Sequence, residues 1–107
     1  MRRFLAAAAV FVCLLDAALP QDKPMEAVCG DLFGARQTAI RLMQQGWPTQ
    51  TIVQQTLDRP EWRNASTPAK SMLMELLQET FNDPGAPSSA VIRDCVRRAE
   101  SGAPKRQ

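Results

Sequence analysis

The stretch TPAKSMLMELLQETF, residues 67–81, decides the fold class because its apolar residues recur at helical spacing. The intervals of three and four residues place them on one face of an α-helix: Ala69, Met72, Leu73, Leu76, Leu77 and Phe81. Thr67 is a suitable N-cap, and Pro68 suits the first helical position. The segment therefore predicts an amphipathic helix, with Leu76 and Leu77 at the centre of the core.

The segments before this helix repeat the helical pattern. A helix is expected over about residues 25–45, because apolar residues follow one face: Cys29, Leu32, Phe33, Ala39, Ile40 and Met43. Gly46 just beyond it suits a left-handed cap. A shorter helix over 48–57 is expected to begin at Pro48, and its inward residues are Ile52, Val53 and Leu57.

A last helix is expected after residues 82–87, a loop that contains two prolines and a glycine. Ser88 or Ser89 suits its N-cap, and its expected inward residues are Val91, Ile92, Cys95, Val96 and Ala99. No segment alternates apolar and polar residues for long enough to predict a strand. The expected fold class is therefore all-α, a small open bundle of about four short helices.

Two further segments are expected to lie outside the helices. Residues 58–66, DRPEWRNAS, are polar and interrupted by proline, which predicts a loop. Trp62 within this loop is expected to fold back onto the core. Residues 101–107 contain Gly, Pro, Lys and Arg and are expected to form a flexible tail. The helical domain is thus placed at residues 21–100.

The first twenty residues, MRRFLAAAAVFVCLLDAALP, carry the pattern of a secretory signal peptide. Arg2 and Arg3 precede an apolar run over 4–15, and small residues follow at 17 and 18. A membrane-spanning helix needs about 20 apolar residues, and this run is shorter. The signal peptide is therefore assigned to residues 1–20, with cleavage near 17–20. Retention as a membrane anchor and lipid attachment at Cys13 are the alternatives.

Removal of the signal leaves one small, nearly neutral domain. The net charge falls from +2 to +1, because Arg2, Arg3 and Asp16 are lost. Such a balance indicates no nucleic-acid partner and no charged membrane surface. The protein is expected in the periplasm or outside the cell, with no stable membrane span after cleavage.

Two cysteines, Cys29 and Cys95, remain after export to an oxidising compartment. One intramolecular disulfide is the simplest interpretation there. Closing so long a loop stabilises a domain by about 4 kcal/mol when the effect is attributed to unfolded-chain entropy. Two reactive thiols, a metal pair and a disulfide to another chain are the alternatives. A metal pair is disfavoured because the chain has no histidine and zinc sites need three or four protein ligands.

The chain lacks the residues and motifs of common active sites. Histidine and tyrosine are both absent, which removes the commonest general base and one common acid. Three of the five serines stand at helix starts, where capping accounts for them. No glycine-rich phosphate loop and no nucleophile elbow occurs. We therefore expect no enzymatic activity and no cofactor.

Two groups of side chains are compatible with metal binding by residue type alone. Glu75, Glu79 and Asp83 follow one another by one helical turn, but a solvated helix face explains them. Thioethers suit Cu(I), and the methionines are Met25, Met43, Met72 and Met74. Met72 and Met74 point about 200° apart on a helix, so core filling explains them better. No metal site is expected.

Protein binding is the function that small size, export and near-neutral charge leave open. Tryptophan and arginine are favoured at binding hot spots. The candidates for exposed contact with a partner are Trp47, Trp62, Arg93, Arg97 and Arg98. A periplasmic accessory protein, an inhibitor and an immunity-type factor all fit this description.

Several features together resemble a group of small bacterial periplasmic proteins. They are a signal peptide, Cys29 opening the first helix, a Gln45-Gly46 helix end, a capped short helix over 48–57, and Cys95 in the last helix. This resemblance implies a periplasmic location and a helical fold. In architecture the chain also resembles the acid-activated periplasmic chaperones of the HdeA type, which implies a stress-chaperone role as the alternative function. The cysteines are farther apart here than in those chaperones, so no residue role is carried over.

Overall fold

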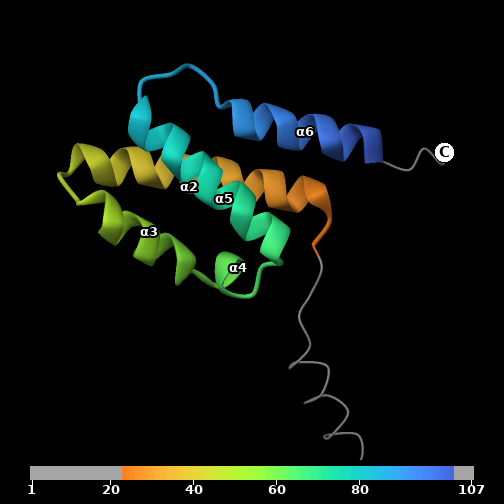
Figure 1. Cartoon of the computed structure of the whole chain (residues 1–107), viewed down its shortest axis with the longest axis horizontal. Helices are drawn as coiled ribbons and strands as arrows, with labels where there is room; N and C mark the ends of the chain where they lie inside the picture. Colours follow the sequence, from red (N-terminus) through yellow and green to blue (C-terminus); the bar gives the residue numbers. More distant parts are fainter. Residues whose placement is uncertain (1–22, 103–107) are drawn as a thin grey trace, which may run out of the picture.

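The computed structural model describes residues 23–102, which form helices joined by short loops, with no strand (Figure 1). The helices are α2 (Met25–Gln44), α3 (Thr49–Leu57), α4 (Pro60–Arg63), α5 (Thr67–Asn82) and α6 (Ala90–Gly102). The all-α prediction is confirmed. The signal segment, its cleavage site and Cys13 lie outside the described residues, as do residues 103–107 of the expected tail. Residues 101 and 102 belong to α6.

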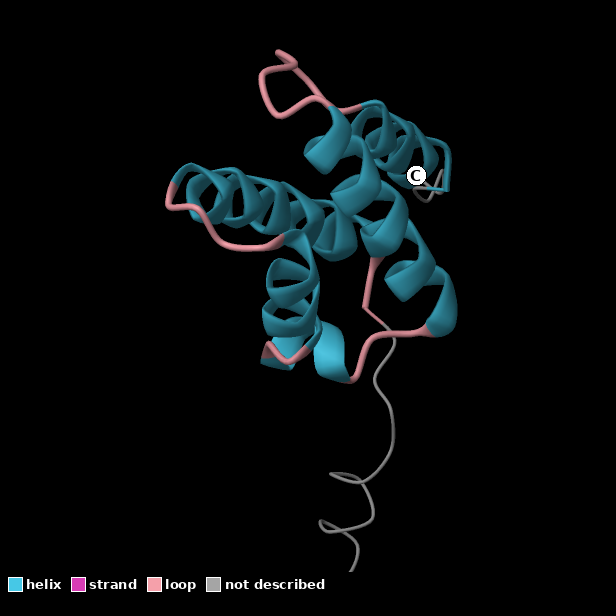
Figure 2. Ribbon diagram, turned by 60° about the vertical axis from the view of Figure 1, so that its left-hand side comes forward, coloured by secondary structure: helices cyan, strands magenta, loops and turns pink. Residues whose placement is uncertain are grey.

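α2 is the central element of the bundle, because it contacts α3, α5 and α6. α6 runs alongside α2, and α5 crosses α2 as Figure 1 shows. Figure 2 shows that α6 and the pair α3–α4 lie on opposite sides of the bundle. α6 is therefore an outer helix whose contacts are with α2 and α5.

The core lies where α2, α3, α4 and α5 meet. Leu76 and Leu77 are 0% and 1% exposed, as predicted for the centre of the core. Other fully buried large side chains are Leu32, Ile52, Trp62 and Leu73. Full burial of one leucine or isoleucine contributes about 1.5–3 kcal/mol. With three such leucines, α5 is held firmly by packing.

The start of α5 differs by one residue from the sequence prediction. Ser66, not Thr67, is the N-cap, and its Oγ accepts a hydrogen bond from the Ala69 amide at 3.3 Å. Serine and threonine are both good caps, so residue type alone does not choose between these neighbours. The shift places Pro68 at the second helical position, where its missing N–H has no partner inside the helix to lose.

The corner between α2 and α3 follows the prediction closely. Gly46 has a φ of +87°, the left-handed conformation expected of a residue that ends a helix. The Trp47 amide donates to the Leu42 carbonyl at 3.0 Å. Pro48 is the N-cap of α3, which begins at Thr49 rather than at the proline.

Residues 58–66 contain a one-turn helix, α4, where a loop is predicted. The prediction was wrong for Pro60–Arg63, because a proline at the first helical position starts a helix as readily as it interrupts one. Arg63 Nη2 donates to the Asp58 carbonyl at 2.7 Å, which closes the turn. α4 directs Trp62 into the core, where it is 1% exposed, as expected for a residue that folds back.

Candidate functional site

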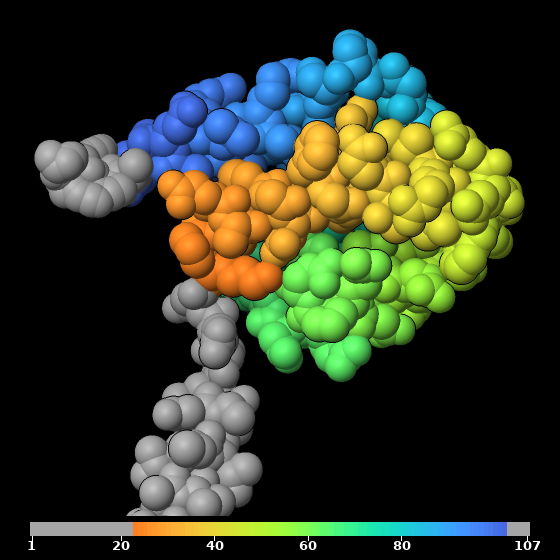
Figure 3. Space-filling view, turned by 180° about the vertical axis from the view of Figure 1, so that it is seen from behind, coloured from red at the N-terminus to blue at the C-terminus, as the bar shows by residue number. Residues whose placement is uncertain are grey.

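The disulfide between Cys29 and Cys95 joins α2 to α6, with 5.7 Å between the two Cα atoms. The predicted pairing is confirmed, so these cysteines are neither free thiols nor a metal pair. Both residues are buried, at 7% and 0% exposed. The bond spans a sequence separation of 66 residues. Figure 3 shows the two helices that it joins lying side by side on the surface, the start of α2 in orange and α6 in blue.

Three exposed apolar side chains stand within about one helical turn of the bonded cysteines along α2 and α6, and we call them the disulfide patch: Met25, Phe33 and Val96. Met25 and Phe33 stand one helical turn before and after Cys29, and Val96 follows Cys95 directly. They are 37%, 53% and 41% exposed. Among residues 23–102, the other exposed large apolar side chain is Met74 on α5. Three of these four exposed side chains therefore stand on the two helices that the disulfide joins.

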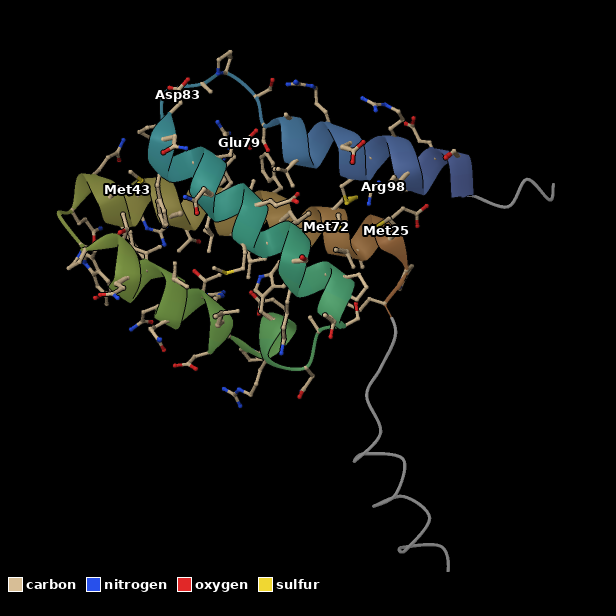
Figure 4. All side chains as sticks on the ribbon, in the orientation of Figure 1. Met25, Met43, Met72, Glu79, Asp83 and Arg98 are labelled. Carbon is tan, nitrogen blue, oxygen red and sulfur yellow. A yellow bond between two sulfur atoms is a disulfide. The ribbon has the colours of Figure 1, made fainter. Side chains whose placement is uncertain are left out.

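Met25 makes direct contact with the disulfide. Its Sδ lies 3.8 Å from Cys95 Sγ. A disulfide-bonded sulfur carries no hydrogen, so this is a van der Waals contact between two polarizable atoms. Figure 4 shows Met25 at the start of α2, beneath α6. Met25 therefore covers the Cys95 side of the bond while keeping part of its own surface exposed.

The prediction that Phe33 and Val96 face the core is wrong, and the position of each on its helix explains why. Leu32 is on the inward face of α2, and Phe33 is turned about 100° from it. The buried residues of α6 are Cys95 and Ala99. They form a narrow stripe along one side of the helix, and Val96 lies outside it. Helical spacing identifies a possible inward face but does not say how much of that face a neighbouring helix covers.

The three arginines predicted as partner contacts lie on the exposed part of α6. Arg97 Nη1 lies 3.2 Å from Asp94 Oδ1, and Arg98 Nη2 lies 3.0 Å from Asp94 Oδ2. Arg93 Nη1 donates to Ser88 Oγ at 2.5 Å. Two arginines thus share one carboxylate, so the outer surface of α6 keeps an excess of positive charge.

The two tryptophans predicted as contacts are not part of this surface. Trp62 is 1% exposed, so the expectation that it is exposed is wrong, and its expected position against the core is confirmed. Its Nε1 is buried without a hydrogen-bond partner among the described residues. Trp47 is half-buried and packs against the core at the α2–α3 corner, which lies away from α6 (Figure 1).

Glu79 has a role that sequence reasoning missed. Its Oε1 accepts from Ser89 Oγ at 2.5 Å, and its Oε2 accepts from the Ala90 amide at 2.9 Å. Ser89 Oγ in turn accepts from the Ile92 amide at 3.1 Å, so Ser89 caps α6 as one of the two predicted candidates. Glu79 therefore holds the start of α6, where a carboxylate also complements the helix dipole, instead of standing free on a solvated face.

Arg36 is a second contact that no local pattern indicates. It is 9% exposed although it lies on a helix, and its Nη2 donates to the Ala86 carbonyl at 2.6 Å. The two residues are 50 positions apart in the sequence. Arg36 therefore fastens the loop between α5 and α6 to the central helix.

The metal-binding alternatives find no support in the geometry. Within residues 23–102, no three His, Cys, Asp or Glu side chains are grouped to hold a metal ion. Met43 lies toward the far end of α2 from Met25 (Figure 4), about 27 Å away at 1.5 Å per residue. Met72 and Met74 are on α5. One ion therefore cannot bind both Met25 and Met43.

Glu61 in α4 has a pKa below its ordinary value. The main cause is a hydrogen bond from Arg59 Nε to Glu61 Oε2, at 2.7 Å. The two side chains are 54% and 28% exposed, so water screens much of their attraction. This pair supports the start of α4 and lies on a different element from the disulfide patch.

These observations define the class of the protein as a small all-α domain closed by one disulfide, with apolar groups exposed around that bond. No family model, curated protein or solved structure matches the chain. Within residues 23–102, no helix has both the length and the apolar character that crossing a membrane requires.

Proposed function

We propose that this protein is exported and binds another protein through the surface that α2 and α6 share. The observation that carries the proposal is the disulfide patch, in which Met25, Phe33 and Val96 are each at least 37% exposed. Single exposed apolar residues are ordinary, whereas a group of them marks an interaction surface. The disulfide holds both contributing helices in one arrangement, which lowers the entropic cost of binding.

The proposed partner offers an apolar surface bordered by carboxylates. Aromatic residues and arginine are the types enriched in protein interfaces, and the exposed Phe33 of α2 and the arginines of α6 supply both types. Arg97 and Arg98 share the single carboxylate of Asp94, so part of their charge is available to an acidic partner. Complementary charge steers association, and added salt should therefore slow binding.

Export and the absence of catalysis are part of the same proposal. The basic and apolar segments at the start of the chain support export, and the disulfide agrees with an oxidising compartment. The lack of histidine and tyrosine supports a binding protein over an enzyme. Mass spectrometry of the exported protein should find its first residue within 18–21; a chain that keeps its signal segment contradicts export with cleavage.

Site-specific photo-crosslinking of the protein, exported to the periplasm of bacterial cells, tests the binding surface. Benzoyl-phenylalanine in place of Phe33 should capture one specific protein, and the same group at Val96 should capture that same protein. Met74 is the matched control position, because it is 42% exposed but lies on α5. Equal adducts at all three positions, or none at Phe33 and Val96, contradict the proposal.

A stress-chaperone function is the second candidate, and Glu79 is the observation that favours it. Its carboxylate accepts hydrogen bonds from Ser89 and from the Ala90 amide. These bonds fasten the start of α6, a helix that buries few side chains of its own, so its release would expose the apolar surface beneath it. At about pH 2–3, where many proteins lose fixed packing, apolar surface should become exposed and aggregation of a client protein should fall. A protein that keeps α6 in place at that pH, or leaves the client unprotected, excludes this function.

A further inference from the structure

α6 lies close against α2 and also contacts α5, but it buries few apolar side chains of its own. Its buried side chains are Cys95 and Ala99, and Val91 and Ile92 pack partly buried against the core. Hydrophobic stabilisation scales with the apolar area removed from water. The apolar side chains of α6 therefore contribute less to the packing of α6 than those of α5 contribute to the packing of α5.

The two halves of α6 are held by different bonds. The first half follows the anchors that Glu79 and Arg36 provide at the cap and at the preceding loop. The second half is held by the bond from Cys95 to Cys29, and beyond Cys95 the buried residue of this helix is Ala99. Loss of the disulfide thus removes the main attachment of the second half.

We propose that the Cys29–Cys95 bond is a releasable clasp for α6, opened by a dithiol reductant while the rest of the protein stays folded. Most of the buried apolar side chains belong to α2, α3, α4 and α5, so these four helices keep a core of their own. After reduction, α6 leaves α2 from its C-terminal end. The oxidised and reduced forms then present different surfaces around Cys29.

The reductant attacks Cys29 Sγ rather than Cys95 Sγ. Thiol–disulfide exchange requires direct approach of a thiolate to one sulfur, so access selects the site of attack. Cys95 is 0% exposed and its Sγ is in contact with Met25 Sδ at 3.8 Å, whereas Cys29 is 7% exposed. Met25 has flexible rotamers and is 37% exposed. It acts as a cover that keeps the reductant away from Cys95 Sγ.

The exchange proceeds in two balanced steps. One thiolate of the dithiol forms a bond to Cys29 Sγ, the Cys29–Cys95 bond breaks, and Cys95 leaves as a thiolate that takes a proton from water. The second thiolate then attacks the reductant's own sulfur in the mixed disulfide, and Cys29 leaves in the same way. Two electrons pass from the dithiol, which ends as a cyclic disulfide, to the two cysteines.

Hydrogen exchange of the full-length exported protein, before and after dithiothreitol, tests the release. In the reduced protein, amides of α6 beyond Cys95 should exchange within threefold of the rate of an unfolded peptide. Amides of α5 should stay at least tenfold slower than that rate. The fluorescence maximum of Trp62, measured in a Trp47→Phe variant because the chain has a second tryptophan, should stay at its oxidised-state value. Loss of protection in α5 together with α6 overturns the proposal, and so does retained protection in α6.

Reduction kinetics test the cover and the site of attack. Met25→Ala uncovers Cys95 Sγ as a second site of attack, so it should be reduced by dithiothreitol at least threefold faster than the parent protein. Met25→Leu, which keeps the bulk, should match the parent. Met74→Ala is the control for an equally exposed methionine on α5; equal rates in the two alanine variants reject Met25 as the cover. A trapped monothiol adduct should be on Cys29, and an adduct mainly on Cys95 overturns the assigned direction.

Discussion

Helices α5 and α6 are both amphipathic, yet different forces hold them in the bundle. α5 buries five side chains along its inward face, namely Ala69, Leu73, Leu76, Leu77 and Thr80. α6 buries Cys95 and Ala99, and one of these two is itself half of the disulfide. Burial contributes about 25 cal/mol per Å² of apolar surface. α5 is therefore attached to the bundle by the packing of its three leucines, whereas α6 is attached by a covalent bond.

The difference shows how a helix with a narrow apolar stripe can belong to a stable fold. α6 depends on the Cys29–Cys95 bond, on the cap that Glu79 provides, and on the loop contact of Arg36. A domain of this size has a free energy of unfolding of about 5–10 kcal/mol. A disulfide worth about 4 kcal/mol is a large fraction of that total.

Breaking the covalent attachment should have the largest effect. Cys95→Ser frees the unfolded chain from its cross-link, which lowers the free energy of unfolding by about 4 kcal/mol. For a domain of this size that corresponds to a fall in Tm of about 15–30 °C. Thermal unfolding followed by circular dichroism measures it, with Cys29→Ser as the companion variant. An unchanged Tm in both variants contradicts the role given to the bond.

Breaking the packing of α5 should have the next largest effect. Leu76→Ala leaves a cavity around a side chain that is 0% exposed, and the expected loss is about 2–5 kcal/mol with the disulfide intact. Urea unfolding of the oxidised protein gives this value. Met74→Ala, on the exposed side of the same helix, should stay within about 0.5 kcal/mol of the parent. Similar losses in the two variants would mean that α5 is not held by its leucine stripe.

Removal of the carboxylate at the start of α6 should have a moderate effect. Glu79→Ala leaves the Ser89 hydroxyl and the Ala90 amide without this acceptor, and we expect a loss of about 1–2 kcal/mol. Glu75→Ala is the matched control, because Glu75 is exposed one turn earlier on the same helix. Urea midpoints of the oxidised proteins compare the two. Equal midpoints show that α6 does not need this cap.

The ion pair between Arg59 and Glu61 lies outside α5 and α6, and it should contribute least to the free energy of unfolding. Arg59→Ala should raise the pKa of Glu61 toward its ordinary value, which an NMR titration measures directly. Because the folded-state pKa is lowered, the pair stabilises the protein above the unfolded-state pKa of about 4.3, and this contribution is lost as pH falls through the folded-state pKa. The effect near neutral pH should stay within about 0.5 kcal/mol. An unchanged titration of Glu61 contradicts the assignment of its shift to Arg59.

The parts of the fold that could be predicted from the sequence depend on a single strong pattern or on elimination. The leucine stripe of residues 67–81 predicts α5, because large apolar side chains at helical spacing have one place in a small domain. The pairing of Cys29 with Cys95 followed because no third cysteine remains after a cleaved signal. Gly46 was identifiable because few residues other than glycine adopt a positive φ.

The candidate site was harder to predict, because it depends on how helices pack against each other. The spacing of Phe33 and Val96 is compatible with an inward position. They are exposed because the neighbouring helices cover only part of the apolar faces of α2 and α6. Trp62 was expected both to fold back onto the core and to be exposed to a partner. In the structure α4 turns its side chain into the core. The contact between Arg36 and Ala86 joins residues 50 positions apart, so no local pattern in the sequence indicates it.

The link between Cys29 and Cys95 also closes residues 29–95 into a covalent ring, from which the two ends of the chain extend. A protease that cuts once inside the ring, for instance in the loop between α5 and α6, linearises it without dividing the molecule. The nicked protein keeps its mass apart from one added water, and it separates into two fragments only on a reducing gel. A first cleavage in that segment therefore does not remove α6 from the protein, because the disulfide still links α6 to α2. The bond thus protects the oxidised protein against the loss of a helix by a single cut.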